Sequence, residues 1–390
     1  MTKLQFDENT DPSEFRAIRL LGVGSYGQVI EVVHVKSGKH LAGKLIKTDQ
    51  LDAEAVIQIK KEISIMKGFF SKYIVNYYGT IRYPKVNPRI MILMDYCDRG
   101  SIRDLMDSRE KVLTEDQISI IMHDLLNALT VLHDQYHTIH RDIKAANILI
   151  SSDYSIKVTD FGVSRQFDPS FQNSMKTVSS IGTPYWMAPE VIDAERYSFP
   201  VDIWSVGATA IELAEGVPPY TEFAPTVAMQ EICLHGFQGF RPTSKLSKSL
   251  QDFIIQCTQK DPASRPTAKQ LLEHPFVKQA EKLSRKEAFE DILKEEIDFD
   301  ELLDDESINE INQIIELEKV PVYNPDTSKS ENRKTHKSFV TPVPKGTKGA
   351  DIYVKEVEAP PQKPASAGNN NTMVIAIAAI IILLLAKLLI

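Results

Sequence analysis

The chain has 390 residues, of which 43% are hydrophobic and 25% charged, with a formal net charge of −8. This composition is typical of a globular protein with a sizeable core, the length allows two or three domains, and the acidic balance gives no reason to expect nucleic acid as a partner. The three cysteines, Cys97, Cys233 and Cys257, stand far apart, which favours a reducing compartment and neither a disulfide framework nor a zinc site.

Residues 1–14 are polar and expected to be flexible, and they contain no secretory signal. Runs rich in β-formers then surround one helical stretch, and after Gly100 the periodicity is mostly helical. A small β-rich lobe followed by a larger helical lobe is therefore predicted, with a ligand cleft between them. The expected strands are 28–35, 40–47 and 89–96, and the expected helices are 53–68, 101–108, 114–135, 201–215 and 250–257.

Three glycines, Gly22, Gly24 and Gly27, follow an apolar run at 18–21. Glycines let backbone amides come close to nucleotide phosphates. A dinucleotide-binding loop has similar glycines but requires a helix directly after them. Residues 28–35 are instead rich in β-branched residues, which favours a phosphate-binding loop between two strands.

Lys44 stands on an expected strand and Glu62 on the expected helix at 53–68. A lysine held by a carboxylate in this way can reach the α- and β-phosphates of a nucleotide. Taken singly, such a pair is usually a surface ion pair of little consequence. Gly43 stands before the lysine in place of a branched residue, which loosens the strand.

The segment 139–149 and the triplet 160–162 carry the most specific pattern. Asp142 is followed by Lys144 and Asn147, and Asp160 stands thirteen residues after Asn147. This set supplies a residue that orients a hydroxyl, a cation for a moving phosphate and two oxygen ligands for Mg²⁺. The pattern predicts phosphoryl transfer.

Together these motifs resemble those of the eukaryotic protein kinases over about residues 15–277. The resemblance implies a bilobal protein kinase fold of the α+β class, ATP and Mg²⁺ as cofactors, and protein hydroxyls as acceptors. It implies that Asp142 is the catalytic base, that Lys144 contacts the γ-phosphate and that Asn147 and Asp160 bind Mg²⁺. The hinge falls at 95–97, where backbone groups of Asp95 and Cys97 would meet adenine, so that the Cys97 thiol is a bystander. The nucleotide-binding residues so implied are Leu21, Gly22, Val23, Gly24, Ser25, Gly27, Val29, Ala42, Lys44, Glu62, Met94, Asp95, Cys97 and Leu149.

The resemblance also addresses the substrate and the supports of the site. Lys144 with Thr183 is typical of serine/threonine specificity, with dual specificity as the alternative. Glu190 is expected to pair with Arg265, and Asp202 to brace the catalytic loop. A finer similarity, to the Hippo-type branch of the sterile-twenty group, rests on residues 24–27, 61–66, 96–97, 113–116, 139–145, 160–163 and 274–276. A carboxy-terminal dimerisation helix of that branch is not evident.

Arg141, beside the catalytic aspartate, suggests activation by phosphorylation, because a guanidinium pairs favourably with a phosphate. Ser179 aligns best with the family's activating site, and Thr177 is its neighbour. The alternative is that both are ordinary polar loop residues. Three closely spaced histidines, His133, His137 and His140, are expected to be structural rather than metal ligands, because nothing nearby completes a zinc set.

The chain after residue 277 consists of three segments that differ in composition. Residues 278–320 are acidic and form either short amphipathic helices that pack on the globular part or a solvated spacer. Residues 321–372, rich in Pro, Lys, Ser and Asn, predict a disordered linker. Residues 373–390 are apolar except for Lys387 and would span about 27 Å as a helix, which suffices for a thin bilayer.

We therefore expect a tail anchor in a lipid bilayer, with the domain at 15–277 in the cytosol. A short span favours the endoplasmic reticulum or the mitochondrial outer membrane. A buried core helix and a glycolipid-anchor signal are the alternatives for 373–390. Besides protein substrates, the expected partners include a second copy of the chain for trans-autophosphorylation. Two other functions are compatible with parts of the pattern: a kinase-shaped scaffold without catalysis, and a small-molecule kinase, against which the segment 183–190 argues.

Overall fold

The computed structural model describes residues 4–24, 27–48, 51–83, 89–161, 165–166, 184–193, 195, 197–242 and 244–294. The chain divides into two units, Met1–Val322 and Tyr323–Ile390. All described residues belong to the first unit. Within them, no helix is both long and apolar enough to cross a membrane, and the segment 373–390 lies outside them.

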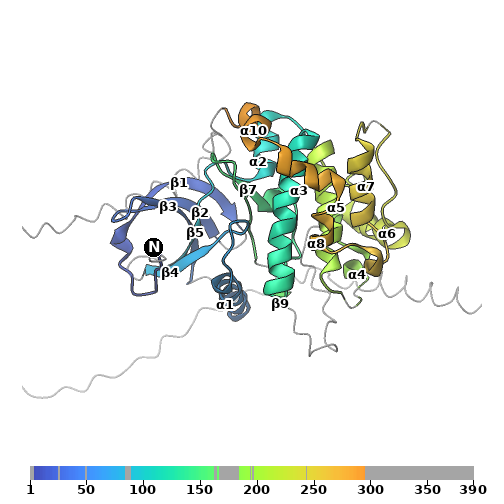
Figure 1. Cartoon of the computed structure of the whole chain (residues 1–390). Coiled ribbons are helices and arrows are strands. Elements are labelled where there is room, and N and C mark those ends of the chain that lie inside the picture. Colours follow the sequence, from blue (N-terminus) through green and yellow to red (C-terminus); the bar gives the residue numbers. More distant parts are fainter. Residues whose placement is uncertain are drawn as a thin grey trace, which may run out of the picture. The chain divides into compact units, whose positions relative to one another are not determined.

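The small lobe is built on one antiparallel sheet with the strand order β1-β2-β3-β5-β4 (Figure 1). One face carries a buried apolar cluster that includes Leu20, Ile30 and Leu41. The single helix α1 begins after Asp52, whose side chain accepts a hydrogen bond from the amide of Ala55 as an N-cap. The elements are β1 (Phe15–Gly24), β2 (Gly27–His34), β3 (Lys39–Lys47), α1 (Ala53–Gly68), β4 (Tyr77–Tyr83) and β5 (Arg89–Asp95).

Gly43, in the middle of β3, is explained by its neighbour on β5. A Cβ atom at residue 43 would lie 2.6 Å from the Sδ atom of Met91 and 3.6 Å from Cγ1 of Ile30. Met91 is fully buried. Its side chain thus fills the volume that a branched residue before Lys44 would occupy, and the strand stays paired on both sides.

The large lobe is mainly helical, and helix α5 is buried on all sides over residues 201–213. The helix expected at 114–135 ends earlier, because five residues after α3 form a π-helical turn. The helices are α2 (Ile102–Arg109), α3 (Glu115–Thr130), α4 (Pro189–Ile192), α5 (Pro200–Glu215), α6 (Pro225–His235), α7 (Lys248–Cys257), α8 (Ala268–Leu271), α9 (Pro275–Lys278) and α10 (Arg285–Leu293). The π-turn is Val131–Gln135, and the 3₁₀ turns are Pro12–Glu14, Ala145–Asn147, Pro184–Trp186, Pro262–Ser264 and Gln279–Lys282. Two short antiparallel sheets pair β6 (Thr138–Ile139) with β9 (Arg165–Gln166), and β7 (Ile148–Ile150) with β8 (Ile156–Val158).

The amino-terminal segment, expected from the sequence to be flexible over 1–14, is described from residue 4 onward, and Phe6 contacts the sheet. The amide of Phe6 donates a 2.8 Å hydrogen bond to the carbonyl of Tyr78 on β4. The Phe6 ring packs edge-on against Phe15 and His34, with both centroid distances 4.9 Å. Phe6 thus fastens this segment to the sheet through its backbone and its ring.

Helix α10, drawn in orange in Figure 1, packs against α3 of the large lobe. Arg285 binds the buried carboxylate of Asp124 through two hydrogen bonds of 2.7 and 2.6 Å. Phe289 is fully buried, and Gln117 donates to the carbonyl of Ala288 at 2.8 Å. Of the two alternatives for the acidic segment, packing on the globular part is therefore observed over 285–293, and residues from 295 onward lie outside the described part.

Candidate active site

Asp142, Lys144 and Asn147 form one hydrogen-bonded group in the loop between β6 and β7. The ammonium of Lys144 lies 2.9 Å from Oδ2 of Asp142. The side-chain amide of Asn147 donates to both the backbone carbonyl and Oδ2 of Asp142, each at 2.8 Å. These two bonds fix the amide group, so its Oδ1 atom remains as a ligand for a cation. The chemistry of this donor set fits Mg²⁺.

Asp160 is brought beside this group by a backbone contact. The amide of Thr159 donates to the carbonyl of Asn147 at 3.0 Å. Asp160 has φ 66°, a left-handed conformation that Asp tolerates better than most residues, and it is exposed. The next residue, Phe161, is buried between Phe69 and His140, with centroid distances of 5.2 and 5.1 Å. The buried ring anchors the backbone that presents the carboxylate of Asp160.

The carboxylate of Asp202 on α5 braces the catalytic loop, as predicted. It accepts hydrogen bonds from the amides of His140 and Arg141 at 2.8 Å each, and it contacts Nε2 of His133 at 2.8 Å. Asp202 is fully buried. Burial alone would raise the pKa of Asp202, but the hydrogen bond and charge of His133 and the other partners hold it below its ordinary value.

The histidines have structural roles where the structure places them in contacts. His133 stacks on Phe199 with a centroid distance of 4.7 Å, and Nε2 of His140 lies 3.0 Å from the carbonyl of Thr159. His137 is exposed. No cluster of His, Cys, Asp and Glu suited to a metal ion occurs in the described part of the chain.

Glu212 is a support of the site that the sequence analysis missed. One of its oxygens accepts hydrogen bonds from the amide of Ala145 in the catalytic loop and from the indole of Trp186, each at 3.0 Å. Burial raises the pKa of Glu212, although these hydrogen bonds oppose it. A glutamate inside the apolar stretch 201–215 was the signal that could have identified it.

Lys44 and Glu62 form the ion pair that the sequence predicted. The ammonium lies 2.8 Å from Oε1 of Glu62, and the two side chains are 14% and 4% exposed. Lys44 lies on β3 between Val29 of β2 and Ile92 of β5 in the strand register. Helix α1 therefore sets the position of the ammonium on the sheet.

The glycine loop is the turn between β1 and β2, where Gly24 pairs with Gly27. Gly27 has φ 155°, and a Cβ there would meet the carbonyl oxygen of Leu45 at 1.9 Å. Only glycine fits this approach of β2 to β3. Around Gly22 a Cβ atom would meet nothing within 4 Å, so space is open next to that backbone. Ser25 lies outside the described residues.

The hinge is held from both lobes through the side chain of Asp95. Its carboxylate accepts hydrogen bonds from Asn76 at 2.7 Å, from the hydroxyl of Tyr78 at 2.8 Å and from Lys157 on β8 at 3.0 Å. Burial would raise the pKa of Asp95, but the charge of Lys157 and the Asn76 hydrogen bonds lower it. Burial raises the pKa of Cys97 to about 11, so its thiol is neutral at physiological pH.

The other expected nucleotide-lining residues belong to the same elements. Ala42 on β3 pairs with Met94 on β5, and Leu149 lies on β7 opposite Lys157. Leu21 and Val23 lie on β1, and Val29 lies on β2.

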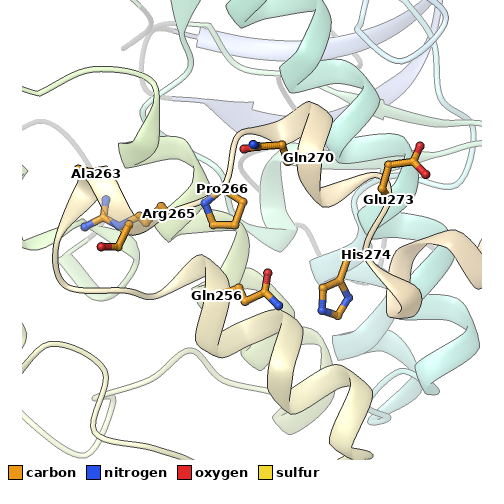
Figure 2. A pocket seen from close by; sticks show the side chains of 8 residues that line it. Gln256, Ala263, Arg265, Pro266, Gln270, Glu273 and His274 are labelled. Atoms are coloured by element: carbon orange, nitrogen blue, oxygen red, sulfur yellow. The ribbon is translucent and has the colours of Figure 1, made fainter.

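The predicted Glu190–Arg265 pair is present and deeply buried. Arg265 donates to both carboxylate oxygens of Glu190, at 2.6 and 2.9 Å. Arg265 also lines a hollow of about 480 Å³ in the large lobe, shown in Figure 2. None of the proposed nucleotide-binding residues lines this hollow, and its arginine is committed to Glu190, so the hollow is separate from the candidate active site.

Of the three residues in the regulatory prediction, the structure describes only Arg141. Ser179 and Thr177 lie outside the described residues. Arg141 has φ 74°, and its guanidinium lies over the ring of Tyr197, 5.7 Å from the centroid. Within the described part of the chain, no carboxylate forms an ion pair with the Arg141 side chain.

A β-rich lobe whose lysine is held by a helix, joined to a helical lobe that presents two aspartates and an asparagine, is the arrangement of a phosphate-transferring enzyme. Residues 15–277 match the protein kinase domain family. The chain belongs to this family. It is also 45% identical over 260 residues to a protein of Dictyostelium discoideum named serine/threonine-protein kinase pakG. That alignment covers 67% of this chain and 21% of pakG, so the chain spans about a fifth of the length of this curated relative.

Proposed function

We propose that this protein is a serine/threonine protein kinase that transfers the γ-phosphate of ATP to protein hydroxyls. The observation that carries the proposal is the hydrogen-bonded group of Asp142, Lys144 and Asn147, with the backbone of Thr159 bringing Asp160 beside it. The printed name of pakG and membership of the kinase family support the same activity.

The residues divide the work of phosphoryl transfer. Asp142 orients the substrate hydroxyl and accepts its proton as the hydroxyl oxygen attacks. Lys144, already within 3 Å of Asp142, neutralises charge on the moving phosphate. Lys44, held by Glu62, binds the phosphates that precede the transferred group. Asn147 and Asp160 would hold Mg²⁺, which supplies positive charge to the phosphate oxygens when it is bound.

The test is transfer of ³²P from Mg-ATP to a generic basic protein by the full chain, in parallel with two single variants. Asp160→Ala is expected to abolish transfer, while Asp134→Ala, an exposed aspartate after α3, serves as the matched control and keeps full activity. Phosphoamino acid analysis of the product should give phosphoserine or phosphothreonine. Transfer that persists in Asp160→Ala, or phosphotyrosine as the main product, would contradict the proposal.

We further propose a place in the sterile-twenty group, near its Hippo-type branch, on the motifs given above. The acceptor preference follows from Lys144 and Thr183. Activation would come from a phosphate on Ser179 or Thr177 that pairs with Arg141, a guanidinium without a carboxylate ion pair among the described residues. Changing both hydroxyl residues to Ala should cut activity strongly, and full activity in the double variant would reject this form of regulation.

We propose also that residues 373–390 anchor the protein in a thin membrane, with the kinase domain on the cytosolic side. An anchored enzyme reaches a high effective concentration towards membrane substrates and towards copies of itself, which favours trans-autophosphorylation. The full chain should float with liposomes, whereas a chain that lacks 373–390 should not. If the full chain and the chain without 373–390 autophosphorylate at the same rate on liposomes, anchoring does not promote activation.

A further inference from the structure

A polar network lies where the first three strands of the sheet meet the hinge. Glu31 on β2 accepts a hydrogen bond from Nε of Arg19 on β1 at 3.0 Å, and its other oxygen lies 2.6 Å from Nδ1 of His40 on β3. Arg19 also donates from Nη2 to the hydroxyl of Tyr96 in the hinge at 2.8 Å. The rings of His40 and Tyr96 stack at 6.2 Å between centroids. Each of these four residues contacts two of the others, and together they are called the Arg19 network.

The Arg19 network lies on the nucleotide-facing side of the sheet. Side chains two residues apart on a strand point to the same face. Glu31 therefore shares a face with Val29, and His40 shares a face with Ala42 and Lys44. Val29 and Ala42 are expected to contact adenine, and Lys44 the phosphates. The network is thus the row of side chains next to the proposed adenine-lining row.

The low solvent exposure of the Glu31 side chain restricts the geometry of the network. The side chain of Glu31 is 7% exposed and that of Arg19 is 32% exposed. A carboxylate with so little access to water depends on its protein partners for solvation, so Glu31 fixes both Arg19 and His40. Burial raises the pKa of Tyr96 to about 12, so its hydroxyl stays neutral and its oxygen accepts from the arginine.

We propose that the Arg19 network is a positioning device for ATP, holding the hinge at a fixed place against the sheet before the nucleotide binds. This inference rests on the proposed kinase function. Tyr96 directly precedes Cys97, whose backbone is expected to meet adenine. A bond that fixes the Tyr96 hydroxyl therefore fixes the adjacent adenine-binding backbone, and preorganisation of this kind increases affinity. The groups that act on the transferred phosphate belong to other elements and should work at the same rate once ATP is bound.

The experiment compares single variants of the full chain. Tyr96→Phe removes the hydroxyl and keeps the ring on His40, and Arg19→Met removes the guanidinium. Both should raise KM for ATP about three- to tenfold with kcat within about twofold of wild type. Glu31→Gln, which keeps an acceptor for Arg19, should raise KM less than Glu31→Ala. Lys36→Ala is the matched control, since it removes the exposed end of an ion pair with Glu14 in the same lobe and should leave KM unchanged.

The dissociation constant of a fluorescent ATP analogue, measured on the same proteins, separates the two proposals. Weaker binding in Tyr96→Phe supports the network even if wild type shows no phosphoryl transfer, an outcome that would count against the kinase function alone. Unchanged nucleotide affinity in Tyr96→Phe and Arg19→Met, or a fall in kcat at constant KM, would overturn the positioning role. A lower unfolding temperature with unchanged affinity would show that the network only stabilises the fold.

Discussion

In the large lobe, buried carboxylates hold the catalytic loop through its backbone, whereas in the small lobe an ion pair between two separate elements holds Lys44. Asp202 binds the amides of His140 and Arg141, and Glu212 binds the amide of Ala145. Lys44 instead depends on Glu62, which is carried by α1. These hydrogen bonds fix the backbone of the catalytic loop to the core of the large lobe. The ammonium of Lys44 depends on the place of α1 for its carboxylate partner, so a movement of α1 would alter the geometry of the site without unfolding the protein.

The largest loss of stability is expected when the buried Glu190–Arg265 ion pair of the large lobe is broken. Arg265→Ala leaves the carboxylate of Glu190, which is 4% exposed, without its cation, and should lower the free energy of unfolding by about 3–5 kcal/mol. Urea unfolding measures the loss. The control is Arg82→Ala, because the pair that Arg82 forms with Glu8 is more than half exposed on both sides and should contribute little. Equal losses in the two variants would show that the large lobe does not depend on buried charge pairs.

In the small lobe, breaking the Lys44–Glu62 ion pair should reduce activity more than stability. Lys44→Met should reduce phosphoryl transfer at least about 100-fold, because a cation that stabilises the phosphates is lost. The free energy of unfolding should change less than in Arg265→Ala, because Arg265 also donates hydrogen bonds to three backbone carbonyls and its side chain is fully buried, whereas that of Lys44 is 14% exposed. Steady-state kinetics and urea unfolding of the same preparation give both quantities. A loss of stability as large as that of Arg265→Ala would erase the distinction between the lobes.

A smaller effect is expected at α10, which extends the large lobe beyond residue 277. Arg285→Met removes the partner of Asp124, and since the arginine side chain is 36% exposed, solvent screening limits the expected loss to about 1–2 kcal/mol. Lys286→Met, the exposed neighbour on the same helix, is the control. If both variants unfold at the same urea concentration, α10 does not contribute through this ion pair.

The smallest effect concerns the hinge between the lobes and appears at acid pH. The pKa of Asp95 is lower in the folded state than its ordinary value of about 4. A lowered folded-state pKa contributes stability above the unfolded-state value, and this contribution is lost as the pH falls towards the folded-state value. Wild type should therefore lose more stability between pH 5 and pH 3 than Asp95→Asn does, as followed by thermal unfolding. Parallel pH profiles would show that the carboxylate is not stabilised in the folded hinge.

The sequence predicts the residues of compact motifs better than the contacts that hold them. Asp142, Lys144 and Asn147 lie within six positions of one another, so local spacing alone indicated their chemistry. The Glu190–Arg265 pair, by contrast, was expected from family resemblance and not from spacing. The placement of Ser179 and Thr177 stays a prediction.

Contacts between distant segments without a motif were not predicted. Glu212 is one of three acidic residues in the mostly apolar helix α5, and Arg285 meets Asp124 across 161 positions of the chain. Phe6 contacts the sheet through its amide and its ring. Periodicity reports which face of an element is buried, but it does not say which distant residue lies opposite. Such pairs are decided by the tertiary arrangement, and the structure was needed to find them.

The glycine before Lys44 makes two positions of the chain dependent on each other. Since the Met91 side chain occupies the volume above Gly43, alanine or valine at 43 requires the Met91 side chain to shift or residue 91 to become smaller, and a smaller residue at 91 alone leaves a cavity. Either single change passes through a less stable protein, whereas the double change restores the packing. A branched residue before the lysine should therefore be tolerated best when residue 91 is made smaller in the same variant.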